Sequence, residues 1–447
     1  MYSAFYFIVA LAILVVVHEF GHFWVARRCG VKVLTFSVGF GRTLWQKTGK
    51  DGTKYIVAMI PLGGYVKMLD EREGPVDDAE LAYSFNRQPL RSRVAIVAAG
   101  PIANLVFAIA AYWLIFVMGI PGIKPIIDFI EPTTPAFQAQ LVVGDEIQAI
   151  NNKPTPTWQS VYKELAVVSE HGGTVNLTIA SGTIQQQRQI TVPKRNLEQK
   201  PQQSLLEQLG ITPVRIKLLP IVDNVVAGGA ADRAGLKKGD LLLSHNGQHI
   251  DDWNRWVDLI KSSPEKALNI TIERNKQQID LALTPAKGDD NSGFIGARVN
   301  ASATPIPKAL QAELRHGPID ALYYASKETW QFTTSTLKSL GGMLVGTVST
   351  KNLGGPISIA QYAGSSAEQG AITFISFLAM ISISLGILNL LPIPILDGGH
   401  LMLYFIEALK GSPLSESMQQ SAQKLGIMLL LTLMILAFFN DLTRLFG

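Results

Sequence analysis

Residues 18–22 are HEFGH, which places two histidines and a glutamate inside an apolar stretch that starts near the N-terminus. In a helix, positions i and i+4 lie on one face, so His18 and His22 can offer imidazole nitrogens to one metal ion. Hydrolysis at zinc needs such nitrogen ligands, an open position for water and a carboxylate that takes the proton from the water. Glu19 is therefore the candidate general base.

Chance is a weak explanation for this pattern, since an HExxH would arise roughly 0.004 times in a chain of this composition. The main alternative is that these polar groups bond neighbouring helices or line a pore. Ionisable residues inside membrane spans are costly, so this alternative is also a functional one.

The composition favours a membrane protein, with 47% hydrophobic and 17% charged residues among 447. Four apolar stretches approach or exceed the roughly 20 residues that cross a bilayer as a helix, namely about 4–25, 94–118, 374–396 and 425–440, the last being the shortest. The single cysteine excludes a multi-cysteine metal cage. The net charge of +4, without basic runs interleaved with aromatics, argues against nucleic-acid binding.

Basic residues gather between the first two stretches, which predicts that residues 27–93 lie on the cytoplasmic side. With four spans, both termini and the insert at 119–373 then lie outside. The first and third spans run in the same direction, so their C-terminal ends reach the same depth. Asp397, in LDGGH after the third span, is therefore the candidate third ligand, ahead of its neighbour His400. The alternative for Asp397 is an Asp-Gly-Gly turn that caps a helix.

The insert contains two copies of one segment, aligned without a gap at one constant offset. The identities pair Ala136, Ala139, Leu141, Gly144, Asp145, Asn151 and Trp158 with Ala231, Ala234, Leu236, Gly239, Asp240, Asn246 and Trp253. Stretches such as AADRAGLKKGDLLLSHNGQHI resemble circularly permuted bacterial PDZ domains, which bind extended chain ends by strand addition. The alternative is a rigid spacer. After the repeat, residues 303–370 carry an amphipathic helical pattern and are expected to lie on the membrane face.

HEFGH on a first span, LDGG after a later span and PDZ repeats between them resemble the site-2 protease family of intramembrane zinc metalloproteases. Further matches are PLGGYVKMLDE (61–71), AGPIANLVFA (99–108), NLGGPISIA (352–360) and FNDLTRL (439–445). The resemblance implies one Zn²⁺ per chain, held by His18, His22 and Asp397, with Glu19 as the catalytic glutamate. It also implies that Asn389 helps to hold the substrate strand.

In that family a cytoplasmic membrane-reentrant β element contains the match to GGYVKML, residues 63–69. Alone, this stretch predicts a short strand after a Gly-Gly turn, with Tyr65, Lys67 and Leu69 on one face and Val66 and Met68 on the other. An edge strand here could keep a substrate segment extended, whereas the alternative is a surface hairpin. The candidate substrate contacts are Asn389, Gly63, Gly64, Tyr65, Val66, Lys67, Met68, Asn104, Pro392 and Pro394.

Pro392 and Pro394 each remove a backbone donor, which predicts an unwound chain near the site. Asn104 could equally bond a neighbouring helix.

The expected fold is a polytopic α-helical membrane protein with four transmembrane helices, two tandem extracytoplasmic PDZ domains and a cytoplasmic membrane-associated β element. The expected segments are the first span with HExxH (1–26), a cytoplasmic loop with the β element (27–93), the second span (94–118), the PDZ domains (119–213 and 214–300), amphipathic bridging helices (301–373), the third span (374–397), a cytoplasmic loop (398–424) and the fourth span with the tail (425–447).

The expected function is cleavage of single-span membrane proteins within the bilayer. The resemblance implies a bacterial inner-membrane location and a substrate such as an anti-sigma factor after a first extracytoplasmic cut, in envelope stress signalling, besides signal-peptide remnants. The PDZ domains would either bind or exclude substrate ectodomains. The rival functions are a PDZ-based membrane scaffold with a structural zinc site, and a metal or ion transporter.

Overall fold

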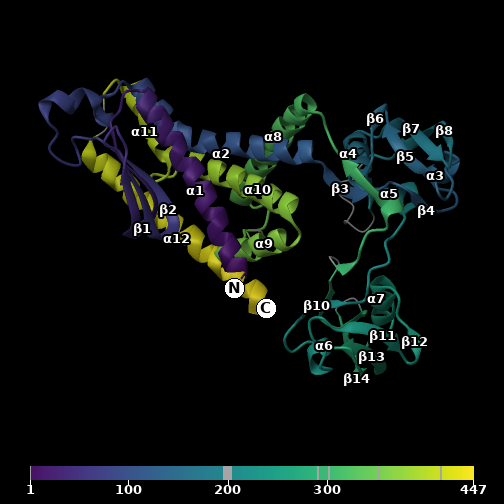
Figure 1. The fold of residues 1–447 in the computed structure, drawn as a ribbon. Coiled ribbons are helices and arrows are strands. Elements are labelled where there is room, and N and C mark those ends of the chain that lie inside the picture. Colours follow the sequence, from purple (N-terminus) through teal and green to yellow (C-terminus); the bar gives the residue numbers. More distant parts are fainter. Residues whose placement is uncertain are drawn as a thin grey trace. The chain divides into compact units, whose positions relative to one another are not determined.

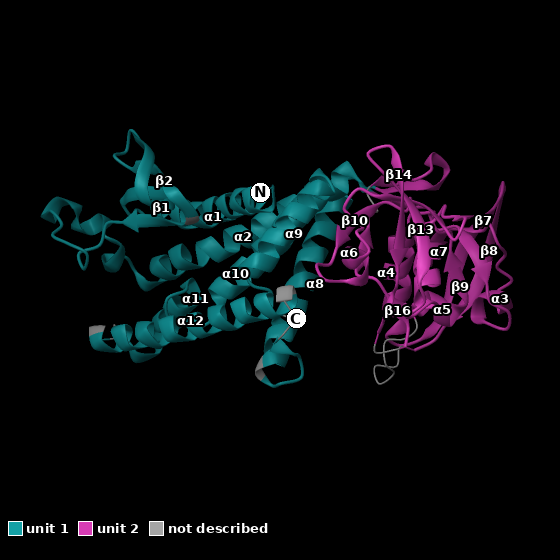
Figure 2. Cartoon of the chain, turned by 90° about the horizontal axis from the view of Figure 1, so that it is seen from below, with its two compact units in different colours: residues 1–120, 315–447 teal, residues 121–314 magenta. Residues whose placement is uncertain are grey.

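The computed structural model describes residues 2–194, 204–288, 291–300, 303–350, 353–412 and 415–446. The chain forms two compact units, one made of residues 1–120 and 315–447 and the other of residues 121–314 (Figure 2). The expected boundary at residue 301 and the first residue of NLGGPISIA lie outside the described residues.

The first unit contains four helices that are long and apolar enough to cross a membrane (Figure 1). They are α1 (Tyr2–Arg28), α2 (Leu90–Met118), α10 (Ala371–Leu390) and α12 (Glu416–Phe446). Helix α2 packs against both α1 and α10. The helix that carries the predicted fourth span begins before residue 425, because polar residues there extend it, and the candidate span covers Ser417–Arg444. The shortest of the four candidate spans is α10, with 20 residues.

Among the described residues, this unit also contains the α-helices α8 (Pro318–Leu344), α9 (Pro356–Glu368) and α11 (Asp397–Lys410). The fully buried Ala321 and Ala325 of α8 belong to the core that α8 shares with α2 and α10. The helical pattern predicted from residue 303 is wrong before α8. There, Gln311–Leu314 form strand β18, which pairs with β3 (Ile120–Ile123). Pairing satisfies the backbone of this segment without a helix, which the nearby Pro305 and Pro307 disfavour.

Strands β1 (Val33–Thr48) and β2 (Lys54–Met68) form an antiparallel pair, in which the first part of β1 pairs with both ends of the bent strand β2. The register pairs residues 33–38 with residues 64–68 on one side and with residues 54–57 on the other. Among the residues described, 64–68 pair with 33–38 alone, so they form an edge of the sheet.

The predicted Gly-Gly turn in this element is wrong, because Gly63 and Gly64 lie within β2. Gly63 has a φ of 145°, a value that lets glycine bend the strand where other residues would be strained. Leu69, predicted on the face of Tyr65 and Lys67, lies beyond the strand and is buried, whereas the other two are exposed.

The second unit contains two substructures that share the order of their first seven elements and differ after the seventh. The first has β4 (Ile127–Ile130), α3 (Pro135–Gln138), β5 (Glu146–Ile150), β6 (Lys153–Pro154), α4 (Trp158–Ser169), β7 (Gly173–Ser181), β8 (Ile184–Val192), α5 (Leu205–Leu209) and β9 (Ile211–Pro213). The second has β10 (Val222–Val225), α6 (Ala230–Arg233), β11 (Leu241–His245), β12 (Gln248–His249), α7 (Trp253–Lys261), β13 (Leu268–Arg274), β14 (Gln277–Leu283), β15 (Ala286–Lys287), β16 (Gly293–Phe294) and β17 (Ala297–Val299).

Each substructure has its own four-stranded sheet, in the orders β6-β5-β7-β8 and β12-β11-β13-β14, and its own hydrophobic core. The repeated aspartates explain part of the sequence identity. Buried Asp145 and Asp240 accept backbone hydrogen bonds from Val142 and Lys237 at 2.9 and 2.7 Å, which closes the same turn in both copies.

Candidate metal centre

His18, His22 and Asp397 meet where α1 faces the first turn of α11. Nε2 of His18 lies 3.2 Å from Oδ2 of Asp397, and Nε2 of His22 lies 3.5 Å from the same oxygen. The two Nε2 atoms are 3.2 Å apart. Within the described ranges this is the one group of three or more His, Cys, Asp or Glu side chains whose ligand atoms converge in this way. The structure thus brings the three predicted ligands together.

The donor set fits a zinc ion. Oδ2 of Asp397 is buried and has no hydrogen-bond partner of normal geometry among the described residues. A buried carboxylate oxygen without a donor is costly unless a positive charge compensates it. Two imidazoles and one carboxylate are a ligand set used by catalytic zinc sites, in which the fourth position is open.

Helix α2 contacts both histidines at Nδ1, the ring nitrogen that does not face Asp397. Nδ1 of His22 donates to the carbonyl of Ile96 at 2.8 Å, and Nδ1 of His18 lies 3.2 Å from Nδ2 of Asn104. Gly100 lies between these two contacts, and a Cβ there would overlap both imidazoles. Metal-binding histidines almost always use their second nitrogen for such a contact, which fixes the ring.

Sequence reasoning missed Ile96 and Gly100. The contact of Ile96 is made by its backbone carbonyl, which every residue has, so the sequence does not distinguish this residue from others. Gly100 could have been found, since it precedes Asn104 by one helical turn and so shares its face of α2.

The chain between α10 and α11 aims Asp397 at the histidines. Helix α10 ends at Leu390, and residues 391–396, which include Pro392 and Pro394, are not helical, as the prolines predict. A Cβ at Gly398 or Gly399 would overlap the backbone of residues 390–394. The two glycines therefore allow α11 to begin directly against the end of α10.

An ion pair holds α11 against the start of α2. Arg93 donates to both carboxylate oxygens of Glu407, at 3.2 and 2.6 Å, and its guanidinium lies 5.1 Å from the ring centre of Tyr404. Both charged side chains are 14% exposed, so the pair is screened little by water. Because α11 begins at Asp397, this contact helps to fix the position of the third candidate ligand.

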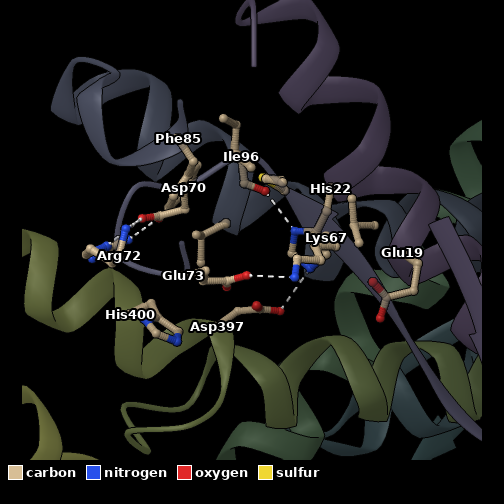
Figure 3. Close-up of a pocket in the computed structure, with 13 residues that line it drawn as sticks. Glu19, His22, Lys67, Asp70, Arg72, Glu73, Phe85, Ile96, Asp397 and His400 are labelled. Atoms are coloured by element: carbon tan, nitrogen blue, oxygen red, sulfur yellow. Dashed lines mark hydrogen bonds and ion pairs between the residues drawn. The ribbon is translucent and has the colours of Figure 1, made fainter. Parts of the chain in front are cut away.

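A cavity of about 340 Å³ lies beside the candidate ligands His22 and Asp397 (Figure 3). The candidates that line it are Glu19, His22, Asp397, Val66, Lys67 and Met68. His400 also lines the cavity, and burial lowers the pKa of its imidazole. Burial raises the pKa of Asp70 at the same cavity, but hydrogen bonds from Arg72 outweigh this effect and keep that pKa below its ordinary value.

The other candidate substrate contacts do not line this cavity. Gly64 lies next to it, because a Cβ there would be 3.0 Å from Cγ of Glu19. Strand β2 therefore packs directly beside the candidate general base. Asn389 is half-buried at the end of α10. The remaining residues outside the lining are Gly63, Tyr65, Asn104, Pro392 and Pro394.

Comparison with known proteins gives matches along nearly the whole chain. The model of "Peptidase family M50" matches residues 6–433. The chain is 44% identical to regulator of sigma-E protease RseP of Salmonella typhimurium and 43% identical to that of Escherichia coli K12, each over 444 residues. It is 44% identical to protease RseP of Yersinia pestis over 445 residues. Each alignment covers 98% of both chains. The chain therefore belongs to peptidase family M50 and is a zinc metalloprotease.

Proposed function

We propose that His18, His22 and Asp397 hold one zinc ion and that Glu19 is the general base for hydrolysis of a peptide bond. The convergence of the three ligand atoms on one point carries this proposal. The unpartnered Oδ2 of Asp397 supports it, because a cation would supply the missing interaction. Glu19 follows His18 directly in the helix and lines the same cavity.

Zinc held there would supply Lewis acidity, which lowers the pKa of water enough for it to lose a proton and become a nucleophile near neutral pH. Glu19 takes the proton of the attacking water and later delivers it to the leaving amine. His22 is held by Ile96, so its Nε2 keeps a free lone pair. The carboxylate of Asp397 adds a negative charge, which helps to balance the charge of the ion.

The edge of β2 at residues 64–68 is the proposed binding site for the substrate segment. An extended segment added to this edge exposes its peptide bonds, whereas a helix buries them in its own hydrogen bonds. The edge lies beside Glu19, and residues 66–68 line the cavity at the candidate ligands. Asn389 and the non-helical residues 391–396, with Pro392 and Pro394, are proposed to contact the same segment.

We propose that cleavage takes place within the bilayer, on single-span membrane proteins. The position of His18 and His22 inside an apolar helix supports this. The name of the relatives, regulator of sigma-E protease, supports an anti-sigma factor in sigma-E signalling as the substrate. Signal-peptide remnants are the second proposed class of substrate.

We propose an inner-membrane protein with both termini outside. Arg27 and Arg28 in the last turn of α1 support a cytoplasmic position for that end, near which the site lies. The two substructures of the second unit are proposed to be periplasmic PDZ domains, at 119–213 and 214–300, that bind or exclude substrate ectodomains. The repeated order of elements supports this.

Reconstitution in liposomes tests the proposal. The full chain is combined with a single-span reporter, and the products are mapped by mass spectrometry. Cleavage inside the apolar segment of the reporter, lost with a zinc chelator and restored by Zn²⁺, is expected. Binding of the reporter without cleavage would instead support a scaffold.

A further inference from the structure

The side chain of Asn104 contacts the His18 imidazole through the nitrogen that does not face Asp397. Nδ2 of Asn104 lies 3.2 Å from Nδ1 of His18. Asn104 is fully buried, and its Oδ1 has no hydrogen-bond partner among the residues described. A buried amide oxygen without a donor costs about 1–3 kcal/mol, so its presence calls for an explanation.

The tautomer that a metal-binding histidine must adopt explains why an amide lies beside His18. A histidine that binds through Nε2 carries its proton on Nδ1, and this proton needs an acceptor. For His22 the acceptor is the carbonyl of Ile96, at 2.8 Å. For His18 the corresponding group is the amide of Asn104. A half-turn of the amide exchanges its two ends and places Oδ1 where it can accept the Nδ1 proton.

The backbone of Asn104 is fixed by a second helix. The hydroxyl of Ser382 on α10 donates to the Asn104 carbonyl at 2.8 Å. Gly386 of α10 packs closely on the same part of α2, since a Cβ there would lie 3.1 Å from the carbonyl oxygen of Pro101 and 3.5 Å from Cβ of Asn104. Asn104 can therefore hold the His18 ring from a rigid point where α1, α2 and α10 meet.

We infer that Asn104 is a positioning residue of the metal centre, which fixes the tautomer and the orientation of His18 by accepting its Nδ1 proton. This inference rests on the proposed ligand set. It replaces the substrate contact that the sequence had suggested for Asn104, because the amide contacts His18 and Asn104 does not line the cavity.

Four full-chain variants in detergent test the inference. Asn104→Leu keeps a similar volume without an acceptor, and Asn104→Asp keeps an acceptor. Ser382→Ala removes the other tertiary hydrogen bond of Asn104 without touching the imidazole, and His18→Ala removes the ligand. The measurements are the zinc dissociation constant by chelator competition, the absorption spectrum of the Co²⁺-substituted protein, and kcat and KM for a reporter.

Asn104→Leu is expected to weaken zinc binding about 10- to 100-fold and to alter the Co²⁺ spectrum. Asn104→Asp is expected to remain within a few-fold of the wild type, with its spectrum. Ser382→Ala leaves the acceptor in place and is expected to weaken zinc binding less than Asn104→Leu does. If Asn104→Leu does not fold, Asn104→Ala is judged by the same criteria. A non-bonding variant with wild-type zinc affinity and spectrum overturns the inference, and a raised KM alone would then identify a substrate contact. Undiminished zinc binding in His18→Ala would instead contradict the proposed ligand set.

Discussion

Oδ2 of Asp397 lies 3.2 Å from Nε2 of His18, so the start of α11 reaches the second half of α1. Helix α2 contacts both elements and supplies none of the three candidate ligands. Its residues contact the elements of the candidate metal site. Ile96 and Asn104 contact the two histidines, and Arg93 forms an ion pair with Glu407 on α11.

Asp397 and His400 differ in their expected roles, although both line the cavity. Asp397→Ala removes one of three ligands and is expected to abolish stoichiometric zinc binding. His400→Ala is expected to keep it, since the ligand atoms of the metal group are those of His18, His22 and Asp397. Zinc content of the purified variants is the measurement. Equal zinc in wild type and Asp397→Ala would remove Asp397 from the ligand set.

Gly100→Ala tests whether α2 sets the position of the imidazoles. The added methyl group would overlap the rings of His22 and His18, so zinc affinity is expected to fall at least about 10-fold. Gly341→Ala is the matched control, because this helical glycine in α8 has open space where the methyl group would go. Chelator competition measures both. Unchanged affinity in Gly100→Ala would mean that the rings are free to move.

Arg93→Gln tests the contact between α2 and α11. Loss of the charged hydrogen bonds to Glu407 is expected to lower the free energy of unfolding by about 1.5–3 kcal/mol and to weaken zinc binding, because Asp397 begins the released helix. The control is Arg87→Gln, which breaks a similar pair with Glu71 in which the side chains are 50% and 29% exposed. Such exposed pairs contribute about 0–1 kcal/mol. A control that loses as much stability would contradict this account.

Asp441 joins α12 to the start of α9. Its buried carboxylate accepts backbone hydrogen bonds from Gly355, Ile357 and Ser358, at 3.0, 2.9 and 3.2 Å. Asp441→Ala leaves these donors without a partner and is expected to destabilise the protein by at least about 2 kcal/mol. Thermal unfolding is compared with that of Thr443→Ala, which removes a hydrogen bond of an exposed side chain on the same helix. Equal melting temperatures would show that α9 does not depend on Asp441.

The sequence predicted the three candidate ligands that the structure brings together. The HExxH spacing places two of them on one helix face, and the expected direction of the spans places Asp397 at the same depth. It also predicted the end of α10, since Pro392 and Pro394 cannot continue a helix. It misplaced the turn at Gly63, where a long strand bends without ending. It also predicted a helix at 311–314, where pairing with a distant strand decides the structure.

The contacts behind the ligands could not be predicted in the same way. Every residue has a backbone carbonyl group. That of Ile96 accepts the hydrogen bond from His22 only because α1 packs against α2 at this point. The pair formed by Arg93 and Glu407 joins residues that are far apart in the chain, and nothing local in the sequence links them.

The central claim is that Glu19 acts on the proton of the attacking water at a zinc ion held by the other three residues. Glu19→Gln keeps the shape of the side chain and removes its basicity. The decisive measurement is the cleavage rate of a membrane-embedded reporter by wild type and Glu19→Gln, with zinc content determined on the same samples. The account predicts wild-type zinc content with cleavage reduced at least about 100-fold. Cleavage by Glu19→Gln at the wild-type rate would contradict it.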